Sequence, residues 1–454
     1  MKQSPVCVMT IAGSDSSGGA GIAADLKTFA AVGVYGTFAI TAVTAQNTLG
    51  VEEIFPIPAQ TVKQQIETTL ADIPVKVVKT GMLYTKETIE AVAELVSKFK
   101  LKAVVDPVFR AGTGAMLIRE DAKKALAESL IPKTYVLTPN RYEAEDLAGM
   151  PIRDVDDMKK AAEKIARLGV DAVIIKGGHV ESEETVTDIL YHKGEFYAFT
   201  KPRIRIQTHG SGCTFSAAVA AYLALGFNLF EATSNAESFL KDAVAFSTKI
   251  GKGRVPVNSL ALLRNEAEKF YVLNNVSKAV EIIEHEPLFA DFIAEVGMQI
   301  GMALPYAAEE RHVAAVKGRI VRCGKLPKAV GCVEYGASSH IARIILTAMK
   351  HDPLKRAALN LRYDTQLVEA FRQLGFTVAS FDRKYEPKEI KTKEGSTLSW
   401  GINEAIRKAG KVPEVIYDLG DVGKEPMIRV LGSSATEVAE NALKAIQQTQ
   451  QFCK

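Results

Sequence analysis

Along roughly the first 260 residues, short runs of apolar, largely β-branched residues alternate with longer stretches in which apolar residues recur every three or four positions. The short runs predict strands, and the longer stretches predict helices with one apolar face. The predicted strands are 6–13, 37–46, 75–81, 102–108, 134–140 and 171–178, and the predicted helices are 23–33, 88–99, 120–130 and 158–169. This alternation is typical of an α/β fold, a mostly parallel sheet with helices on both faces.

Two features follow this alternation. Residues 187–199 predict a hairpin that turns at Lys193-Gly194, an antiparallel addition common at the margin of such sheets. The pattern is then continuously helical over 239–251 and 260–286. Beyond residue 285 a different α/β pattern begins, with predicted strands at 329–336, 376–382 and 414–420. We therefore expect a first domain over 1–262, a helical linker over 263–284, and a second, smaller α/β domain over 285–454.

Length and composition agree with two globular domains. A chain of 454 residues exceeds what one hydrophobic core usually organises, and its 47% hydrophobic and 24% charged residues are ordinary fractions. A net charge of +3 is too small to indicate a nucleic-acid surface. No apolar run approaches the roughly 20 residues that span a bilayer, and the N-terminal segment lacks a signal peptide's cleavage region, so we expect a cytoplasmic protein. The five cysteines form no C-x-x-C pair, which argues against a disulfide framework and a structural zinc site.

The first candidate for chemistry is a glycine-rich loop near the N-terminus. Gly13, Gly18, Gly19 and Gly21 follow an apolar strand and open a predicted helix. Glycine lets backbone N–H groups approach a ligand closely, because no Cβ intervenes. The loop has neither the P-loop lysine nor the dinucleotide G-x-G-x-x-G spacing. By itself it is explained almost as well by a tight turn with no ligand.

A second glycine-rich loop precedes a long apolar helix at residues 208–226. Gly210 and Gly212 place backbone donors and the positive end of the helix dipole toward a common point, which favours an anion there. Phosphoryl transfer needs such donors, because charge on the transferred group must be stabilised in place. Cys213 stands at this helix N-terminus, where we expect a depressed thiol pKa. The alternative is an inert helix cap.

Polar residues also recur at the carboxyl end of one predicted strand after another. They are Gln46, Gly81-Met82, Asp106, Thr138-Pro139-Asn140 with Glu143, and Lys176-Gly177-Gly178. Ligands of open α/β sheets bind outside these strand ends. Packing alone does not explain such a recurrence, so these residues predict a binding site.

These motifs and their order resemble the ribokinase-like superfamily, and more narrowly its hydroxymethylpyrimidine kinase/phosphomethylpyrimidine kinase family. The segments that carry the resemblance span the first half: AGSDSSGGAGIAADLKTF, AVTAQNT, KTGML, VDPV, LTPNRYEAEDL, VIIKGGH and THGSGCTFSAA. The resemblance implies a ribokinase-like fold. It also implies ATP-dependent phosphorylation of 4-amino-5-hydroxymethyl-2-methylpyrimidine and then of its monophosphate, with Mg²⁺.

The same resemblance implies a role for each matching residue. Gly13, Asp25 and Gln46 would hold the pyrimidine, with Met82 and Val108 as apolar walls. Lys176 would touch the ATP phosphates. Thr208, Gly210 and Gly212 would belong to the anion loop, residues 208–213, which would bind the transferred phosphoryl group. Asn140 would lie with them at the nucleotide, while Asp106 and Glu143 would organise Mg²⁺ through water. A lid over the pocket is expected at 110–114, on its glycine content alone.

Cys213 separates this chain from the sugar and pyridoxal kinases of the same fold. Those kinases carry Gly-x-Gly-Asp, whose carboxylate is the general base, whereas this chain has Gly-Ser-Gly-Cys. A thiolate can accept the hydroxyl proton, although phosphoryl transfer depends more on positioning than on basicity. In the second phosphorylation the acceptor is already ionised. We therefore expect Cys213→Ala to impair the first step more than the second.

The second half resembles the non-barrel type of thiamine-phosphate synthase domain that occurs fused to the pyrimidine kinase. The segments VEYGASSHIARIIL, LNLRYD, FDRKYEP, EGSTLSWGI and VIYDLGDVGKEPMIRVLG carry this resemblance. It implies condensation of hydroxymethylpyrimidine diphosphate with thiazole phosphate, with release of pyrophosphate. Arg319 would hold the departing pyrophosphate, and His340 would bind phosphate or assist transfer. Taken singly, a solvated face explains the arginines, and a cap or core residue explains the histidine.

Two alternatives stay open. Domains of the second type also occur fused to DNA-binding modules, where they sense thiamine phosphates instead of making them, and the first domain could be a pyridoxal kinase. The expected partners are the small-molecule substrates named above, with no nucleic acid and no membrane, and kinases of this type imply a homodimer. Formation of thiamine phosphate from both phosphorylated substrates, as opposed to binding without product, discriminates the enzyme from the sensor.

Overall fold

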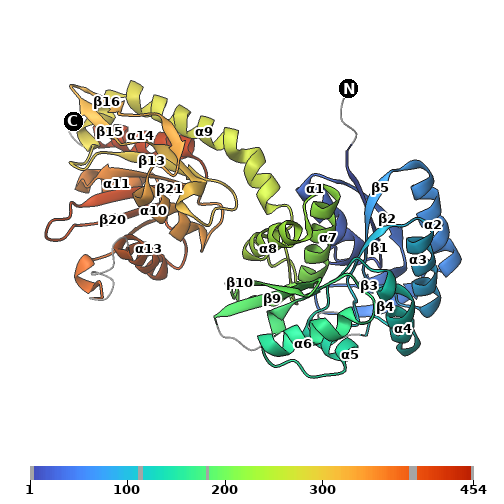
Figure 1. Cartoon of the computed structure of the whole chain (residues 1–454). Helices are drawn as coiled ribbons and strands as arrows, with labels where there is room; N and C mark the ends of the chain where they lie inside the picture. The colour runs from blue at the N-terminus through green and yellow to red at the C-terminus, as the bar shows by residue number, and fades with distance from the viewer. Residues whose placement is uncertain (1–4, 111–115, 180–183, 388–395, 451–454) are drawn as a thin grey trace. The chain divides into compact units, whose positions relative to one another are not determined.

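The computed structural model describes residues 5–110, 116–179, 184–387 and 396–450, which form two compact units, Met1–Leu262 and Leu263–Lys454 (Figure 1). The first unit is built on an eight-stranded sheet in the order β10-β9-β8-β7-β6-β5-β1-β2. Its strands are β1 (Cys7–Ala12), β2 (Tyr35–Ile40), β5 (Val75–Thr80), β6 (Lys102–Val105), β7 (Val136–Leu137), β8 (Ala172–Ile175), β9 (Thr185–His192) and β10 (Glu195–Pro202). From β2 to β8 the pairings are parallel, which confirms the mostly parallel α/β sheet.

Helices cover both faces of this sheet. One face packs against α1 (Gly21–Val32), α7 (Ser211–Ala224) and α8 (Leu229–Ala245). The other carries α2 (Ala59–Asp72), α3 (Lys86–Lys98), α4 (Glu120–Ala125), α5 (Arg141–Ala148) and α6 (Val155–Ala166). The predicted helix 120–130 is α4 continued by a π-helical turn, Leu126–Leu130, and a 3₁₀ turn, Ile131–Lys133.

The predicted hairpin is confirmed as β9–β10 at the edge of the sheet, antiparallel to its neighbour β8. Its turn residues Lys193 and Gly194 both have positive φ, 51° and 86°. The predicted strand 37–46 is instead two strands separated at Thr41. β2 stays in the main sheet, whereas β3 (Ala42–Gln46) pairs with β4 (Val51–Pro56) in a separate hairpin. A short parallel pair, β11 (Thr208–His209) and β12 (Val255–Pro256), lies before α7 and after α8.

The second unit contains a seven-stranded, mostly antiparallel sheet in the order β17-β14-β13-β18-β21-β20-β19. Its strands are β13 (Gln299–Ala303), β14 (Val313–Val316), β17 (Val333–Tyr335), β18 (Ala357–Arg362), β19 (Val378–Ser380), β20 (Val415–Asp418) and β21 (Met427–Gly432). A small hairpin is formed by β15 (Ile320–Cys323) and β16 (Leu326–Ala329). The predicted strand 329–336 is divided between β16 and β17, because Gly331 and Cys332 lie outside any strand.

Two helical layers cover this second sheet. One face packs against α9 (Ala261–His285), α11 (Thr365–Gln373) and α14 (Ala435–Thr449). The other packs against α10 (Ser339–Met349) and α13 (Ser396–Ala409). The segment 263–284, expected as a linker, lies inside α9, and its residues Val272, Val276 and Ile283 are buried in the core of the second unit. Because those side chains belong to that core, the segment is part of the second unit.

Candidate active site

A cavity of about 940 Å³ opens at the carboxyl ends of the parallel strands in the first unit. Nearly every residue that the sequence predicted for the first site lines it: Gly13, Gln46, Met82, Asp106, Val108, Asn140, Glu143, Lys176, Thr208, Gly210, Gly212 and Cys213. Asp25 is absent from this lining. Of the expected lid segment 110–114, Arg110 lines the cavity and 111–114 lie outside the described residues.

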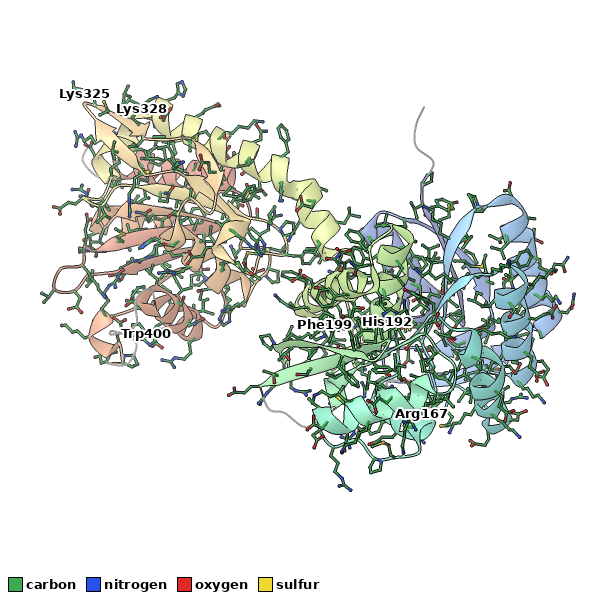
Figure 2. The ribbon with its side chains drawn as sticks, in the orientation of Figure 1. Arg167, His192, Phe199, Lys325, Lys328 and Trp400 are labelled. Atoms are coloured by element: carbon green, nitrogen blue, oxygen red, sulfur yellow. The ribbon has the colours of Figure 1, made fainter. Side chains whose placement is uncertain are left out.

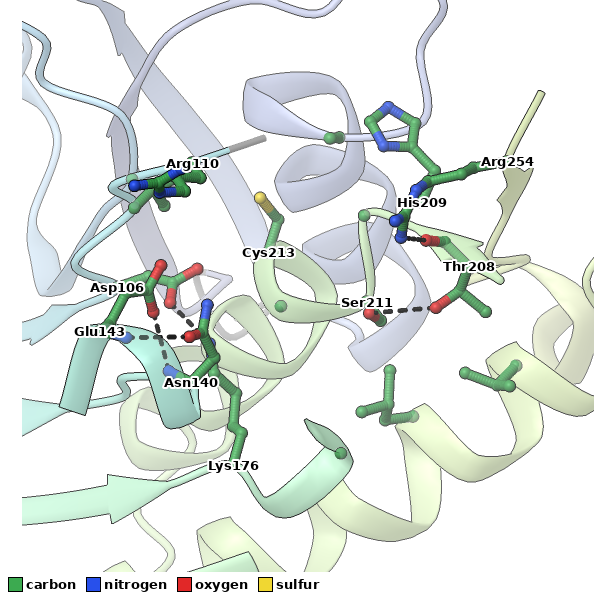
Figure 3. Close-up of a pocket in the computed structure, with 18 of the residues that line it drawn as sticks. Asp106, Arg110, Asn140, Glu143, Lys176, Thr208, His209, Ser211, Cys213 and Arg254 are labelled. Atoms are coloured by element: carbon green, nitrogen blue, oxygen red, sulfur yellow. Dashed lines mark hydrogen bonds and ion pairs between the residues drawn. The ribbon is translucent and has the colours of Figure 1, made fainter. Parts of the chain in front are cut away.

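The second glycine-rich loop forms one wall of the cavity. Gly210 is the N-cap of α7 with φ 81°, a conformation that residues with a Cβ seldom adopt. A Cβ there would lie 1.8 Å from the carbonyl oxygen of Gly19, so the two glycine-rich loops meet backbone to backbone. The Thr208 hydroxyl donates to Ser211 Oγ at 3.2 Å, and Arg254 donates to the Thr208 carbonyl (Figure 3). The first backbone N–H groups of α7 therefore face the cavity from a fixed turn.

Acidic residues and a lysine form the opposite wall (Figure 3). Lys176 Nζ donates to Asp106 Oδ1 at 2.8 Å. A Cβ on Gly212 would stand 3.3 Å from Lys176 Nζ and 3.6 Å from Asp106 Oδ2, so this ion pair lies directly against the anion loop. Burial acts to lower the pKa of Lys176, but the charges of Asp106 and Glu143 outweigh it and raise that pKa. A cation and backbone donors thus converge on one place, as a phosphate group requires.

Glu143 is held by the start of α5. Its carboxylate accepts the backbone N–H of Asn140 at 2.8 Å, while the Asn140 side chain accepts the N–H of Glu143, a complete capping box. Burial raises the pKa of Glu143 to about 7, and the charge of Asp106 acts in the same direction. Glu143 therefore changes charge near neutral pH, beside a carboxylate and a lysine.

Cys213 projects its sulfur between this acidic wall and the side that carries His209 and Arg254 (Figure 3). The expected depression of its pKa is wrong. Burial raises the pKa of the Cys213 thiol to about 11, an effect that outweighs the opposing charge of Lys79. The position at a helix N-terminus is as expected, but desolvation of a thiolate outweighs the helix dipole there.

Asp25 lies behind the cavity wall, fully buried. Its carboxylate accepts two hydrogen bonds from Lys79 Nζ, at 2.8 and 3.0 Å, and one from the Thr10 hydroxyl at 2.6 Å. Although burial acts against it, Asp25 raises the pKa of Lys79 above its ordinary value. The carboxylate expected to hold a pyrimidine is thus committed to a buried ion pair, and Lys79 joins the surroundings of Cys213.

The apolar wall of the cavity is also assembled from segments that are distant in the sequence. Met82 packs with Ala42 and Leu117, and Val108 adjoins this cluster. A Cβ on Gly13 would meet the Met82 methyl at 2.2 Å, so a larger residue there would displace the Met82 side chain. The wall therefore offers an apolar surface of the kind that suits a small aromatic ring.

The structure also brings together Asp15 and His209, two residues of the sequence motifs that reasoning from the sequence did not single out. His209 Nε2 lies 2.7 Å from Asp15 Oδ2 and 3.2 Å from Gln46 Nε2. Asp15 also accepts the backbone N–H groups of Ser17, Gly19 and Ala20. Although burial acts to raise it, hydrogen bonds from His209 and Ser17 lower the pKa of Asp15, so the carboxylate is ionised. Both residues lie within the glycine-rich motifs, but nothing in their spacing shows that they touch.

Among the described residues, no cluster of three or more His, Cys, Asp or Glu side chains could hold a metal ion by itself. Asp106 and Glu143 nevertheless provide two buried carboxylates beside the anion loop. Mg²⁺ usually binds through one or two carboxylates together with water and substrate phosphates. The donors present fit a cation of this kind that arrives with a nucleotide.

The second unit places His340 in the first turn of α10, where the Ser338 hydroxyl caps the helix. His340 Nε2 is buried and has no hydrogen-bond partner within the described part of the chain. Burial lowers the pKa of His340 to about 4, and the nearby charges of Arg429, Arg319 and Arg383 act in the same direction. The structure therefore brings Arg319 and His340 into one electrostatic neighbourhood, with His340 neutral.

Two family models match the chain. The phosphomethylpyrimidine kinase model matches residues 15–258, and the thiamine-phosphate synthase ThiN model matches residues 275–444. A bifunctional thiamine biosynthesis protein ThiDN of Methanocaldococcus jannaschii is 35% identical over 435 residues, covering 95% of this chain and 96% of the relative. A hydroxymethylpyrimidine/phosphomethylpyrimidine kinase of Bacillus subtilis is 46% identical over 259 residues, which are 57% of this chain and 96% of that one.

Solved structures resemble the first unit. The ADP complex of a Bacillus subtilis pyridoxal kinase matches with a TM-score of 0.54 and 40% identity, covering 57% of this chain and 99% of that one. A Staphylococcus aureus pyridoxal kinase in complex with pyridoxal matches with a TM-score of 0.54 and 36% identity, covering 58% of this chain and 96% of that one. The ribokinase-like fold expected from the sequence is thereby confirmed.

Proposed function

The chain belongs to the family of bifunctional thiamine biosynthesis proteins that join a phosphomethylpyrimidine kinase to a ThiN-type thiamine-phosphate synthase, and from this premise we propose how its two sites act. The first unit phosphorylates 4-amino-5-hydroxymethyl-2-methylpyrimidine and then its monophosphate with ATP. The second condenses the resulting diphosphate with thiazole phosphate, giving thiamine phosphate and pyrophosphate.

One observation carries the kinase proposal: the Gly210–Cys213 loop faces Lys176 and Asp106 across a single cavity. The loop's backbone donors stabilise charge on the transferred phosphoryl group, and Lys176 exchanges Asp106 for a phosphate oxygen. Thr208, Gly210, Gly212, Lys176 and Asn140 form the ATP side of the site. Asp106 and Glu143 would hold Mg²⁺ through water, and the cation would neutralise charge on the phosphates.

The alcohol lies at the other end of the cavity. Gln46 and the backbone at Gly13 bind the pyrimidine nitrogens, and Met82 and Val108 line its faces. Asp25 acts on the site only indirectly, because its carboxylate is already paired with Lys79. The placement brings the hydroxymethyl group toward Cys213 and the anion loop.

In the first transfer the alcohol oxygen forms a bond to the γ-phosphorus while the bond from that phosphorus to the bridging oxygen breaks. The electron pair of the broken bond stays on the ADP oxygen, and the hydroxyl proton passes to the Cys213 thiolate. Because the Cys213 thiol has a pKa of about 11, it is mostly protonated at neutral pH, so the thiolate is a weakly populated base. Most of the rate then comes from positioning and from the anion loop.

In the second unit, Arg319 holds the departing diphosphate and the neutral His340 binds phosphate or assists transfer. His340 Nε2, which has no partner among the described residues, is available for a hydrogen bond with a ligand. Cationic side chains that contact the leaving pyrophosphate lower the barrier to its departure from the pyrimidine methylene.

The purified full chain tests the whole proposal in two assays. With ATP and Mg²⁺, ADP release is measured with the pyrimidine alcohol, with its monophosphate and with pyridoxal; we expect kcat/KM for the pyrimidine to exceed that for pyridoxal by more than tenfold. The reverse order would favour a pyridoxal kinase, like the two structural relatives named above. Supplying hydroxymethylpyrimidine diphosphate and thiazole phosphate directly should then yield thiamine phosphate. Binding of both substrates without product would favour a sensor.

The setting of the reaction completes the proposal. No helix within the described residues is long and apolar enough to cross a membrane. We propose that the chain works in the cytoplasm as a homodimer with small-molecule substrates as its partners. Light scattering of the purified chain measures the oligomeric state.

A further inference from the structure

A row of polar side chains crosses the otherwise apolar face of the second sheet that α10 and α13 cover. Gln299, Asn360 and Arg429 lie opposite one another on the neighbouring strands β13, β18 and β21. Side chains alternate between the faces of a strand, so Arg429 shares the face of Leu431, which packs with Ile341 of α10. Arg429 is therefore buried beneath the helix that carries His340 in its first turn.

One carboxylate serves two arginines at the end of this row. Arg383 donates through Nε and a terminal nitrogen to the two oxygens of Asp418, at 2.7 and 3.4 Å, and Arg429 donates to Asp418 Oδ2 at 2.7 Å. All three residues are buried. Both guanidinium groups also lie over the ring of Phe381, at 5.6 and 5.4 Å from its centre. Burial acts to raise the pKa of Asp418, but Arg429 and Arg383 lower it. With Asp418 ionised, the cluster of Arg383, Arg429 and Asp418 carries one net positive charge.

Hydrogen-bonding capacity is left over around this cluster. Arg429 Nε and His340 Nε2 are buried and have no partner among the described residues. An unpaired polar group costs free energy where it is buried. A bound anion would supply an acceptor for Arg429 Nε and for His340 Nε2.

Arg319 reaches the same place from the neighbouring hairpin. Its side chain lies over Gly297, because a Cβ on that glycine would be 2.9 Å from Arg319 Cδ. The carbonyl of Gly297 accepts a hydrogen bond from Asn360 at 3.2 Å, and Asn360 pairs in register with Arg429. The contacts thus connect Arg319, Asn360 and Arg429 independently of any electrostatic argument.

We propose that Arg383 and Arg429, fixed by Asp418, join Arg319 in binding the diphosphate group of the second unit's substrate. This inference rests on the proposed synthase activity and adds two residues that contact the ligand and one, Asp418, that positions them. Guanidinium groups suit this task because they present planar pairs of donors to phosphate oxygens. The thiazole nitrogen forms the new bond to the pyrimidine methylene carbon while the bond from that carbon to the diphosphate oxygen breaks. The electron pair of the broken bond stays on that oxygen, and these arginines stabilise the resulting charge.

The test uses the intact chain with Arg383→Gln and Arg383→Lys. Thiamine phosphate formation is measured with both phosphorylated substrates supplied, and inorganic pyrophosphate serves as the competing anion. We expect the pyrophosphate inhibition constant to rise at least tenfold in Arg383→Gln and the KM for the diphosphate substrate to rise with it. Arg383→Lys should recover part of the loss, because it restores the charge without the paired donors. Arg407, exposed on α13 beside Glu404, provides the matched control Arg407→Gln, with unchanged constants.

Folding is checked in the same samples by urea unfolding followed through Trp400, the only tryptophan in the sequence, which lies in the second unit (Figure 2). An unchanged inhibition constant in a folded Arg383→Gln chain would overturn the inference while leaving the synthase proposal intact. A loss of kcat that matches lost stability, with no change in the inhibition constant, would overturn it too, because it would mean a structural role only.

A second measurement needs no variant. Pyrophosphate is added to the unaltered chain, and amide hydrogen exchange is followed segment by segment. The inference requires slower exchange at residues 383–386, 418–420 and 427–431; protection confined to the first unit, or no protection, would contradict it. If these segments are protected but no thiamine phosphate forms, the anion site stands and the synthase proposal fails.

Discussion

The two units arrange charge around their sites in opposite ways. In the first unit the lysine against the anion loop and the lysine behind the cavity wall are each paired with one carboxylate: Lys176 with Asp106, and Lys79 with Asp25. In the second unit Arg383 and Arg429 share Asp418, and Arg429 Nε finds no acceptor among the described residues. Paired charges must exchange partners when a ligand binds, whereas an excess of buried positive charge is already arranged for an anion.

The difference matches the two kinds of chemistry. A kinase site must accept nucleotide, metal and alcohol and then release two products, so internal pairs keep it stable when empty. A site that only has to hold a leaving diphosphate gains from donors fixed in advance. The substitutions below are ordered from the largest expected effect to the smallest, and each changes one side of this contrast.

Gly210→Ala should have the largest effect, because it alters the anion loop itself. The added Cβ would meet the Gly19 carbonyl at 1.8 Å in a backbone with φ 81°, so the loop must shift. We expect phosphorylation to fall at least about a hundredfold, with thiamine phosphate formation from supplied substrates unchanged. Gly226→Ala is the control, since that glycine also has positive φ but has nothing within 4 Å. Equal losses in the two variants would mean that backbone strain alone is responsible.

Cys213→Ala separates the two phosphorylations. We expect a loss of about 10- to 100-fold in kcat for the alcohol, whose proton must depart, and a loss of only a few fold for the monophosphate, whose acceptor oxygen is ionised. Initial rates of ADP release with each acceptor measure the ratio. Cys7, buried in β1 away from the cavity, gives the control Cys7→Ala. Equal loss of both steps in Cys213→Ala would remove any role in proton departure.

Glu143 provides a test of whether protonation of a carboxylate in the kinase site affects Mg²⁺ binding during the reaction. Because burial raises its pKa to about 7, the fraction of Glu143 that is ionised rises about tenfold between pH 6 and pH 8. The apparent affinity for Mg²⁺ in the kinase assay should strengthen over that range by a comparable factor. Glu143→Gln, assayed beside the unaltered chain so that titration of ATP cancels, should lose this additional pH dependence. Parallel profiles would show that Glu143 does not act on the cation.

His340 gives the smallest effect, on stability. Its pKa of about 4 in the folded chain lies below the ordinary value of 6.5, so the unfolded chain binds more protons between these pH values. The second unit should therefore lose on the order of 1 kcal/mol between pH 6.5 and pH 5. Urea unfolding followed by Trp400 fluorescence measures this loss, which should be smaller in His340→Gln. The same pH dependence in both chains would mean that neither burial nor the arginines lower the pKa of His340 in the folded chain.

Much of this protein follows from the sequence alone. The 2- and 3.6-residue periodicities fix which side chains are buried, and they predicted the mostly parallel sheet, the β9–β10 hairpin and a second α/β unit. The glycine-rich loops and the strand-end residues predicted the lining of the first cavity, because the carboxyl ends of parallel strands meet at one edge.

Only the tertiary structure decided the partner of each charge. Asp25 was expected at a ligand and is paired with Lys79; Cys213 was expected as an activated thiol and is a partly buried one with a raised pKa. Asp15 and His209 are 194 positions apart, and Arg383 meets Asp418 across 35. A pKa and an ion pair depend on distances of a few ångströms and on exclusion of water, and the spacing of residues along a chain determines neither.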